Sequence, residues 1–188
     1  MPLCWDVYVW VPQRAPEVFQ LFIDRYVNTD DPGDERLSAF TRTYLTGTPT
    51  DADASALADL LWSGRDAFTL YLRSGEYPWA MITITDDGAA VLGLSLDGPD
   101  NSPLVRQQAE QLIEQLRREF SSPAGIAGME MPPPGSRQEW QDDQVQLRIG
   151  TLADSPPRRA EPPVAEATPS PLRRVLKGGS PQACPECA

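Results

Sequence analysis

The sequence contains no histidine, and this absence limits the chemistry open to its other reactive side chains. Ser95 lies in Gly93-x-Ser95-x-Asp97, which resembles a nucleophile elbow except that aspartate replaces the second glycine of Gly-x-Ser-x-Gly. A serine nucleophile also needs a base, usually an imidazole, to take its proton. We therefore expect Ser95 to be an ordinary strand residue, with Gly93 beneath a packed helix and a turn after Asp97.

Cys184 and Cys187 have the C-x-x-C spacing that can hold zinc or cycle between a dithiol and a disulfide. A structural zinc site needs four ligands, whereas the chain has 3 cysteines, so such a site would need a carboxylate or a second chain. A redox pair normally lies at a helix N-terminus after a strand, and this pair lies next to the C-terminal residue. We expect two solvated thiols, keep a metal site as the alternative, and predict no cofactor.

Acidic side chains gather in several predicted turns. None follows the ligand spacing of a calcium loop, and such groups are commonly solvated turn and cap residues. The alternative is that they attract a basic partner. The acidic candidates for binding are Asp30, Asp31, Asp34 and Glu35 in one loop, and Asp86 and Asp87 at the tip of a predicted hairpin.

Large aromatic side chains are numerous for a chain of this length, with 5 tryptophans and 5 tyrosines. Core packing accounts for most of them. Trp10 shares one face of the first predicted strand with Tyr8 and Asp6, and Trp79 begins a later strand. Either set could form an exposed hot spot for a protein partner, so Trp10 and Trp79 join the candidate binding residues.

The charge of the chain is unevenly distributed. The 188 residues contain 27 acidic and 16 basic side chains, a net charge of -11. Residues 1–150 contain 23 acidic and 11 basic side chains, net -12, and residues 151–188 have a net charge of +1. A chain without a basic stripe is poorly suited to nucleic acid or an anionic membrane, so we predict neither partner.

The C-terminal segment, residues 151–188, differs in composition from the rest. It holds 8 of the 20 prolines and no aromatic residue, so it cannot bury enough apolar surface to offset the entropy of ordering. We predict an acidic globular domain over 1–150 and a disordered proline-rich tail over 151–188. Within the tail, residues 172–177 form a small basic island that is either a linear binding motif or plain solvated chain.

Apolar periodicity predicts the elements of the domain. Residues 5–11 are rich in β-branched and aromatic types, which favours a strand, and Pro16 opens a helical pattern that ends before Asn28. Residues 37–44 form a shorter helical stripe stopped by Gly47. Thr50 and Asp53 resemble a capping box before a third helix. Residues 68–72 alternate as a strand.

The second half is predicted as a hairpin, a helix and two further strands. Residues 79–85 and 90–96 flank Asp86-Asp87-Gly88, and a three-residue loop that pairs Ile84 with Ala90 keeps one face continuously apolar. Ser102 as N-cap starts a long amphipathic helix whose stripe runs from Leu104 to Phe120. Residues 126–131 and alternating apolar positions over 145–149 are expected as short strands.

These elements predict an α+β fold, a mainly antiparallel sheet with helices packed on one face. The N-terminal residues lack a secretory signal, no run reaches the roughly 18 apolar residues of a membrane span, and 15 arginines against 1 lysine are typical of a GC-rich bacterial genome. We expect a cytoplasmic bacterial protein of open oligomeric state.

The chain is similar in general type to bacterial immunity proteins, which are often small, acidic and without catalytic motifs. That similarity implies a non-enzymatic module that binds a basic protein, and we prefer this interpretation to an enzyme. One alternative is a carboxylate-dependent enzyme, with or without Mg²⁺, that acts on a small or cationic substrate. The other is a scaffold that binds through its tail.

Overall fold

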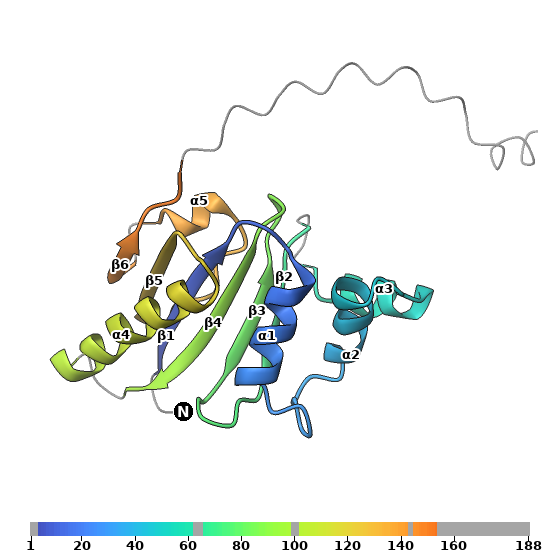
Figure 1. The fold of residues 1–188 in the computed structure, drawn as a ribbon, viewed down its shortest axis with the longest axis horizontal. Helices are drawn as coiled ribbons and strands as arrows, with labels where there is room; N and C mark the ends of the chain where they lie inside the picture. Colours follow the sequence, from blue (N-terminus) through green and yellow to red (C-terminus); the bar gives the residue numbers. More distant parts are fainter. Residues whose placement is uncertain (1–3, 62–65, 99–101, 143–144, 154–188) are drawn as a thin grey trace, which may run out of the picture. The chain divides into compact units, whose positions relative to one another are not determined.

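One antiparallel sheet organises the part of the chain that the computed structural model describes, residues 4–61, 66–98, 102–142 and 145–153 (Figure 1). The fold is α+β, as predicted. The strand order β2-β3-β4-β1-β5-β6 places β1 in the interior and leaves β2 and β6 as the two edges. The strands are β1 Cys4–Val11, β2 Phe68–Leu72, β3 Ala80–Ile84, β4 Ala90–Asp97, β5 Ala124–Met129 and β6 Leu147–Gly150.

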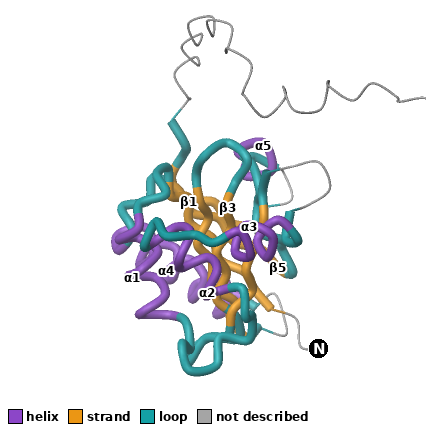
Figure 2. Tube along the Cα trace, turned by 90° about the vertical axis from the view of Figure 1, so that its right-hand side faces the viewer, coloured by secondary structure: helices purple, strands orange, loops and turns teal. Residues whose placement is uncertain are grey.

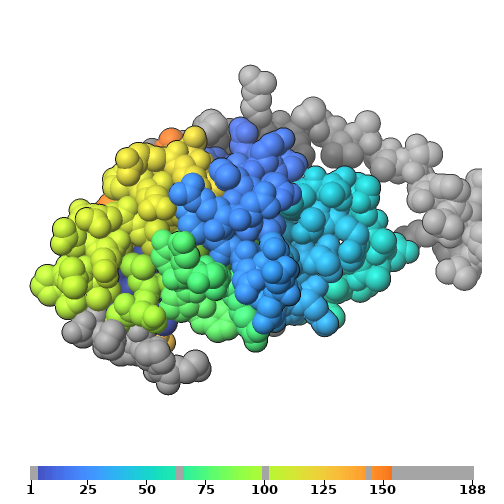
Figure 3. Space-filling view, turned by 60° about the horizontal axis from the view of Figure 1, so that its bottom comes forward, coloured from blue at the N-terminus to red at the C-terminus, as the bar shows by residue number. Residues whose placement is uncertain are grey.

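Helices α1 (Pro16–Tyr26) and α4 (Pro103–Glu119) lie on one side of the sheet, as Figures 1 and 2 show. Both begin with a proline, and the Ser102 side chain accepts the Val105 N–H at 3.3 Å as the expected N-cap. On this face α1 lies between α4 and the segment that leads to α3 (Figure 3). The buried stripes are Phe19, Phe22, Ile23 and Tyr26 on α1, and Val105, Ala109, Leu112, Ile113 and Leu116 on α4.

Leu104 departs from the predicted stripe of α4, because 64% of it is exposed. It precedes the buried Val105 by one residue, which turns it about 100° around the helix axis. Leu104 instead aligns with the exposed Gln108 and Gln111, four and seven residues further on.

The β3–β4 hairpin has the predicted register, with Ile84 opposite Ala90, Ile82 opposite Leu92 and Ala80 opposite Leu94. The Thr85 N–H donates to the Ala89 carbonyl oxygen at 3.1 Å and closes the three-residue loop. Gly88 within that loop has a φ of 89°, a left-handed conformation that glycine adopts without a steric penalty.

The helical stripe predicted over residues 37–44 divides into α2 (Leu37–Phe40) and the π-helical turn η1 (Thr41–Leu45). Helix α3 (Asp51–Ala58) follows. The hydroxyls of Thr41 and Thr43 donate to the carbonyl oxygens four residues earlier, both at 2.9 Å. Such side-chain bonds compete with the regular helix ladder, which favours a wider turn. Gly47, with a φ of 65°, ends the segment as predicted.

A short helix that the sequence pattern did not reveal, α5 (Arg137–Trp140), covers part of the opposite face of the sheet. Its Trp140 packs edge-to-face against Trp10 of β1, with ring centroids 5.3 Å apart. Tyr8, Met81 and Ile126 also belong to this second core. Strand β1 is therefore buried on both faces.

The last strands lie near their predicted positions. Strand β5 ends at Met129, and Glu130, with a φ of 50°, turns the chain away. Val145 lies outside β6 and packs against the second core instead of forming part of a strand. Among the residues that the structure describes, no helix combines the length and the apolar character needed to cross a bilayer. Outside these residues lie 154–188, and with them Cys184, Cys187, the basic island at 172–177 and most of the predicted tail.

Candidate functional site

A groove of about 870 Å³ runs beside the edge strand β2. One wall comes from Thr69 and Tyr71 of β2 and from Trp79, which precedes β3, and the other wall comes from residues 33–36 and from Ala56, Asp59 and Leu60. The groove therefore combines segments that are far apart in the sequence. It also collects exposed aromatic and acidic side chains, which distinguishes it from the rest of the edge.

The aromatic wall follows from the period of the strands. Phe68, Leu70 and Leu72 of β2 are buried on the helix side, so Tyr71 must face the other way. Tyr71 pairs with Met81, and Trp79 lies two residues before Met81 on the same face, which makes the two rings diagonal neighbours. Tyr71 is 46% exposed and Trp79 is 43% exposed. Both are large apolar surfaces available to a ligand.

The acidic wall carries uncompensated negative charge. Asp34 accepts two hydrogen bonds from the Arg36 guanidinium, each 2.8 Å long. These bonds raise the pKa of Arg36, and the charges of Glu35 and Asp59 raise it further, so both carboxylates lie close to this pair. Within the described residues, neither Glu35 nor Asp59 forms a salt bridge of its own.

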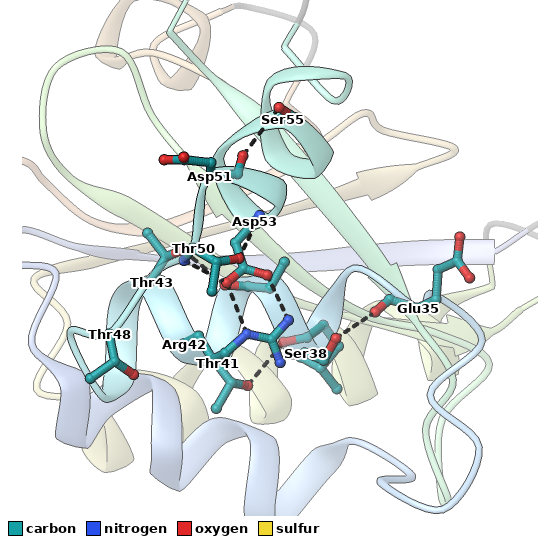
Figure 4. Close-up of polar contacts among 12 residues, drawn as sticks. Glu35, Ser38, Thr41, Arg42, Thr43, Thr48, Thr50, Asp51, Asp53 and Ser55 are labelled. Atoms are coloured by element: carbon teal, nitrogen blue, oxygen red, sulfur yellow. Dashed lines mark hydrogen bonds and ion pairs between the residues drawn. The ribbon is translucent and has the colours of Figure 1, made fainter.

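Helix α3 is held in place by a polar cluster behind this wall (Figure 4). The Thr50 hydroxyl accepts the Asp53 N–H at 3.2 Å, and the Asp53 carboxylate accepts the Thr50 N–H at 2.9 Å, which completes the predicted capping box. Arg42 adds two hydrogen bonds to the same carboxylate, 2.6 and 2.9 Å long. The bonds from Arg42 and from the Thr50 backbone hold the pKa of Asp53 well below its usual range. In Figure 4 the Glu35 carboxylate points away from this cluster.

The predicted acidic loop is only partly drawn into the groove. Asp34 and Glu35 line it, whereas Asp31 forms an ion pair with Arg73, and Asp30 is exposed outside the groove lining. Arg73 also bonds through its backbone to the loop at residues 28 and 32, so the loop is fastened to the end of β2. The ion pair at Asp31 thus positions the loop, and among the described residues Glu35 is the loop carboxylate that lines the groove without an ion pair.

The two candidate tryptophans have different environments. Trp79 lines the groove, together with Glu35. Trp10 is 2% exposed and lies in the second core against Trp140, so it offers no surface to a partner. The prediction of an exposed hot spot at Trp10 is corrected by α5, which covers that part of β1.

Asp86 and Asp87 line a different depression, between the hairpin tip and α5. The Asp86 N–H donates to the Gly135 carbonyl oxygen at 3.0 Å, and the Asp87 carboxylate accepts from the Thr85 hydroxyl. These contacts give both residues a role in the turn. They are separated from Trp79 by the length of β3.

Ser95 is buried, and its hydroxyl donates to the Asp6 carboxylate at 2.6 Å. Burial raises the pKa of Asp6 to about 6, although the hydrogen bonds from Ser95 and from the Met131 N–H oppose this shift. Asp6 does not line the groove. It belongs to β1, and its carboxylate accepts hydrogen bonds from β4 and from the turn after β5. Gly93 lies beneath the Tyr8 ring and not beneath a helix, because a Cβ at Gly93 would come within 2.4 Å of that ring.

Tyr71 and Asp59, which line the groove, are not among the binding residues predicted from the sequence. The alternation over 68–72 places Tyr71 on the face opposite the apolar side chains, but it does not indicate whether that face is covered. Asp59 follows α3 and meets Glu35 only through the folding of the intervening loop. Among the described residues, no three Cys, Asp or Glu side chains converge in a way that could hold a metal ion. Comparison with protein-family models, curated proteins and solved structures finds no match to this chain.

Proposed function

We propose that this chain is a protein-binding module that captures a basic partner in the groove beside β2. The observation that carries the proposal is the meeting of two exposed aromatic rings, Tyr71 and Trp79, with two carboxylates, Glu35 and Asp59, in one groove. Exposed aromatic side chains supply much of the binding energy at protein interfaces. Carboxylates without ion pairs select a cationic partner and accelerate its approach.

The net charge of -12 over residues 1–150 supports the same proposal, because an acidic domain attracts basic proteins over a longer range than any single contact. Neutralisation of a toxic basic protein, the role of bacterial immunity proteins, is one activity that such a module would perform. The carboxylate-enzyme alternative finds less support. Asp6 has the raised pKa that an acid catalyst needs, but its carboxylate serves as an acceptor for Ser95 and Met131 within the fold.

Affinity capture with immobilised full-length chain tests the proposal. The groove variant Glu35→Gln/Asp59→Asn/Trp79→Ala changes exposed side chains only, so it should fold with an unchanged thermal midpoint. We expect the wild type to retain a basic protein that salt releases, and the groove variant to bind it at least tenfold more weakly. The control Asp86→Asn/Leu104→Ala changes an exposed acid and an exposed apolar residue elsewhere and should bind as the wild type does. Equal binding by the groove variant would contradict the proposal.

The tail-scaffold alternative makes the opposite prediction for a truncated chain. Removal of residues 154–188 should leave capture by the groove unchanged, because every groove residue lies before position 80. Loss of capture on truncation, together with normal capture by the groove variant, would assign binding to the tail.

A further inference from the structure

We propose that the partner enters the groove as an added β-strand, with an extended basic segment paired to the outer edge of β2. This inference rests on the proposed function, and it adds the conformation and the residue pattern of the ligand. The geometry that supports it is the direction of the backbone groups of Thr69 and Tyr71, which line the groove.

Arg73, the residue that follows β2, shows where the outer edge lies. Its N–H donates to the Pro32 carbonyl oxygen and its own carbonyl oxygen accepts the Asn28 N–H, both at 2.8 Å. These partners belong to the loop after α1, so the backbone groups of Arg73 point away from β3. Because backbone groups alternate in direction along a strand, those of Tyr71 and Thr69 point the same way.

The β3–β4 hairpin gives the same result independently. The Ser95 N–H donates to the Trp79 carbonyl oxygen at 3.0 Å, and Thr85 bonds Ala89 across the same hairpin, so odd-numbered residues of this segment face β4. The even-numbered residues of β3 therefore bond β2, where they pair with Phe68, Leu70 and Leu72. The backbone groups of Thr69 and Tyr71 remain for the outer edge.

Within the described part of the chain, no backbone hydrogen bond reaches Thr69 or Tyr71 on that edge. An open edge is a template for an additional strand, and proteins usually block it when it has no function. Here the loop at Asn28 and Pro32 blocks the edge at Arg73 only. The Thr69 hydroxyl is bonded to Thr83 at 2.9 Å, so this side chain is directed over the sheet and away from the edge.

The two walls specify the residues of the added segment. An extended chain presents alternate side chains to opposite sides. One set would meet the carboxylates of Glu35 and Asp59, which favours arginine or lysine, and the other would meet the rings of Tyr71 and Trp79, which favours apolar or aromatic residues. The ligand is therefore a protein segment in which basic and apolar residues alternate, and it ends before Arg73.

The test uses the full chain and a capped six-residue peptide that alternates arginine and valine. We expect saturating peptide to slow hydrogen exchange of the Tyr71 amide at least tenfold, with a smaller effect on Leu70 and Leu72, whose amides already bond β3. A peptide N-methylated at one alternate set of residues should bind normally, and methylation of the other set should abolish binding, because only one edge of an added strand pairs with β2. A peptide with glutamate in place of arginine should not bind.

Two variants separate the backbone of Tyr71 from its ring. Tyr71→Ala removes the ring and keeps the N–H, whereas Tyr71→Pro removes both and breaks no bond to β3, since proline is tolerated where the N–H points outward. We expect the proline variant to bind at least fivefold more weakly than the alanine variant when both keep the wild-type unfolding midpoint. If Tyr71→Pro fails to fold, the N-methylated peptides decide the question.

The outcomes distinguish this inference from the proposed function. Peptide binding that Glu35→Gln/Asp59→Asn weakens, without protection of the Tyr71 amide and with equal effects of the two methylation patterns, would overturn strand addition and leave the basic-ligand groove intact. Absence of binding by the wild type would overturn both. Protection of the Tyr71 amide with one-sided sensitivity to methylation would establish strand addition.

Discussion

At the scale of single residues, Asp6 is an acid whose pKa is raised, because its carboxyl is largely buried between two strands and a turn. Its pKa of about 6 exceeds the usual value of about 3.9 in an unfolded chain. The folded state therefore binds more protons than the unfolded state between these values. It follows that the free energy of unfolding decreases as the pH rises from about 4 to about 6, and this loss is complete above the folded pKa.

We predict that Asp6→Asn removes this pH dependence. The asparagine can still accept the Ser95 hydroxyl proton, so the fold should persist. Between pH 4 and pH 7 the wild type should lose on the order of 2 kcal/mol more than the variant, an amount already reduced for the partial exposure of the group. Urea unfolding at several pH values measures it. Asp86→Asn, which changes an exposed carboxylate, should keep the wild-type slope, and parallel curves for the wild type and Asp6→Asn would refute the prediction.

Helix α5 shows, at the scale of elements, how a segment of four residues can decide which surfaces are open. Its Trp140 is 1% exposed and closes the second core over Trp10. Trp140→Ala should therefore cost about 3–5 kcal/mol, as large core truncations do. Trp79→Ala, the same substitution at an exposed position, should change stability by less than about 0.5 kcal/mol. Denaturant midpoints compare them, and equal losses would show that α5 is not part of the folded core.

Helix α3 depends on its cap to hold the acidic wall. It has 8 residues, too few to be stable alone, and Asp59 follows directly after it. Thr50→Ala removes the acceptor of the Asp53 N–H and should cost about 1 kcal/mol, with faster hydrogen exchange in α3. Thr48→Ala provides the matched control, because that hydroxyl is exposed and lies outside the capping box. Unchanged exchange in the Thr50 variant would mean that Arg42 and Asp53 suffice to hold the helix.

The elements that the sequence predicted well are those with a local cause. Pro16, the Thr50 capping box and Ser102 each define a helix start by their own chemistry, and the apolar face of the β3–β4 hairpin admits one register. Helix α5 has no such local signal, because a single tryptophan on four residues produces no period. Of the predicted binding residues, Asp34, Glu35 and Trp79 line the groove. Tyr71 and Asp59 join them through the antiparallel pairing of β2 with β3 and the path of the loop before α3, which local pattern does not encode.

At the scale of the whole molecule, the excess negative charge and the groove act at different steps of binding, the approach of the partner and its docking. The net charge of residues 1–150 extends over the entire domain, but at 0.1 M salt the field of each charge decays over about 10 Å. A strand of five residues such as β3 spans about 17 Å, so Asp86 at one end contributes little to an approach at Trp79 at the other. Local carboxylates should therefore dominate the association rate under physiological conditions.

We accordingly predict that the acidic and the aromatic groove residues affect different rate constants. Stopped-flow measurements with the captured basic partner at 50–500 mM NaCl test this. The wild-type association rate should fall at least tenfold over this range, while the dissociation rate changes less than threefold. Glu35→Gln/Asp59→Asn should flatten the salt dependence of association, because it removes the charges nearest the docking site. Trp79→Ala should keep the salt dependence and accelerate dissociation, since its ring acts only after contact.

The control is Asp86→Asn/Asp87→Asn, which removes two negative charges at the far end of β3, as many as Glu35→Gln/Asp59→Asn removes from the groove. Its association rate and salt dependence should stay close to those of the wild type at 100 mM salt and approach those of Glu35→Gln/Asp59→Asn only at 10 mM, where the field extends about 30 Å. If the two double variants behave alike at 100 mM, recognition depends on net charge alone. The position of the acids beside Tyr71 and Trp79 would then carry no selectivity.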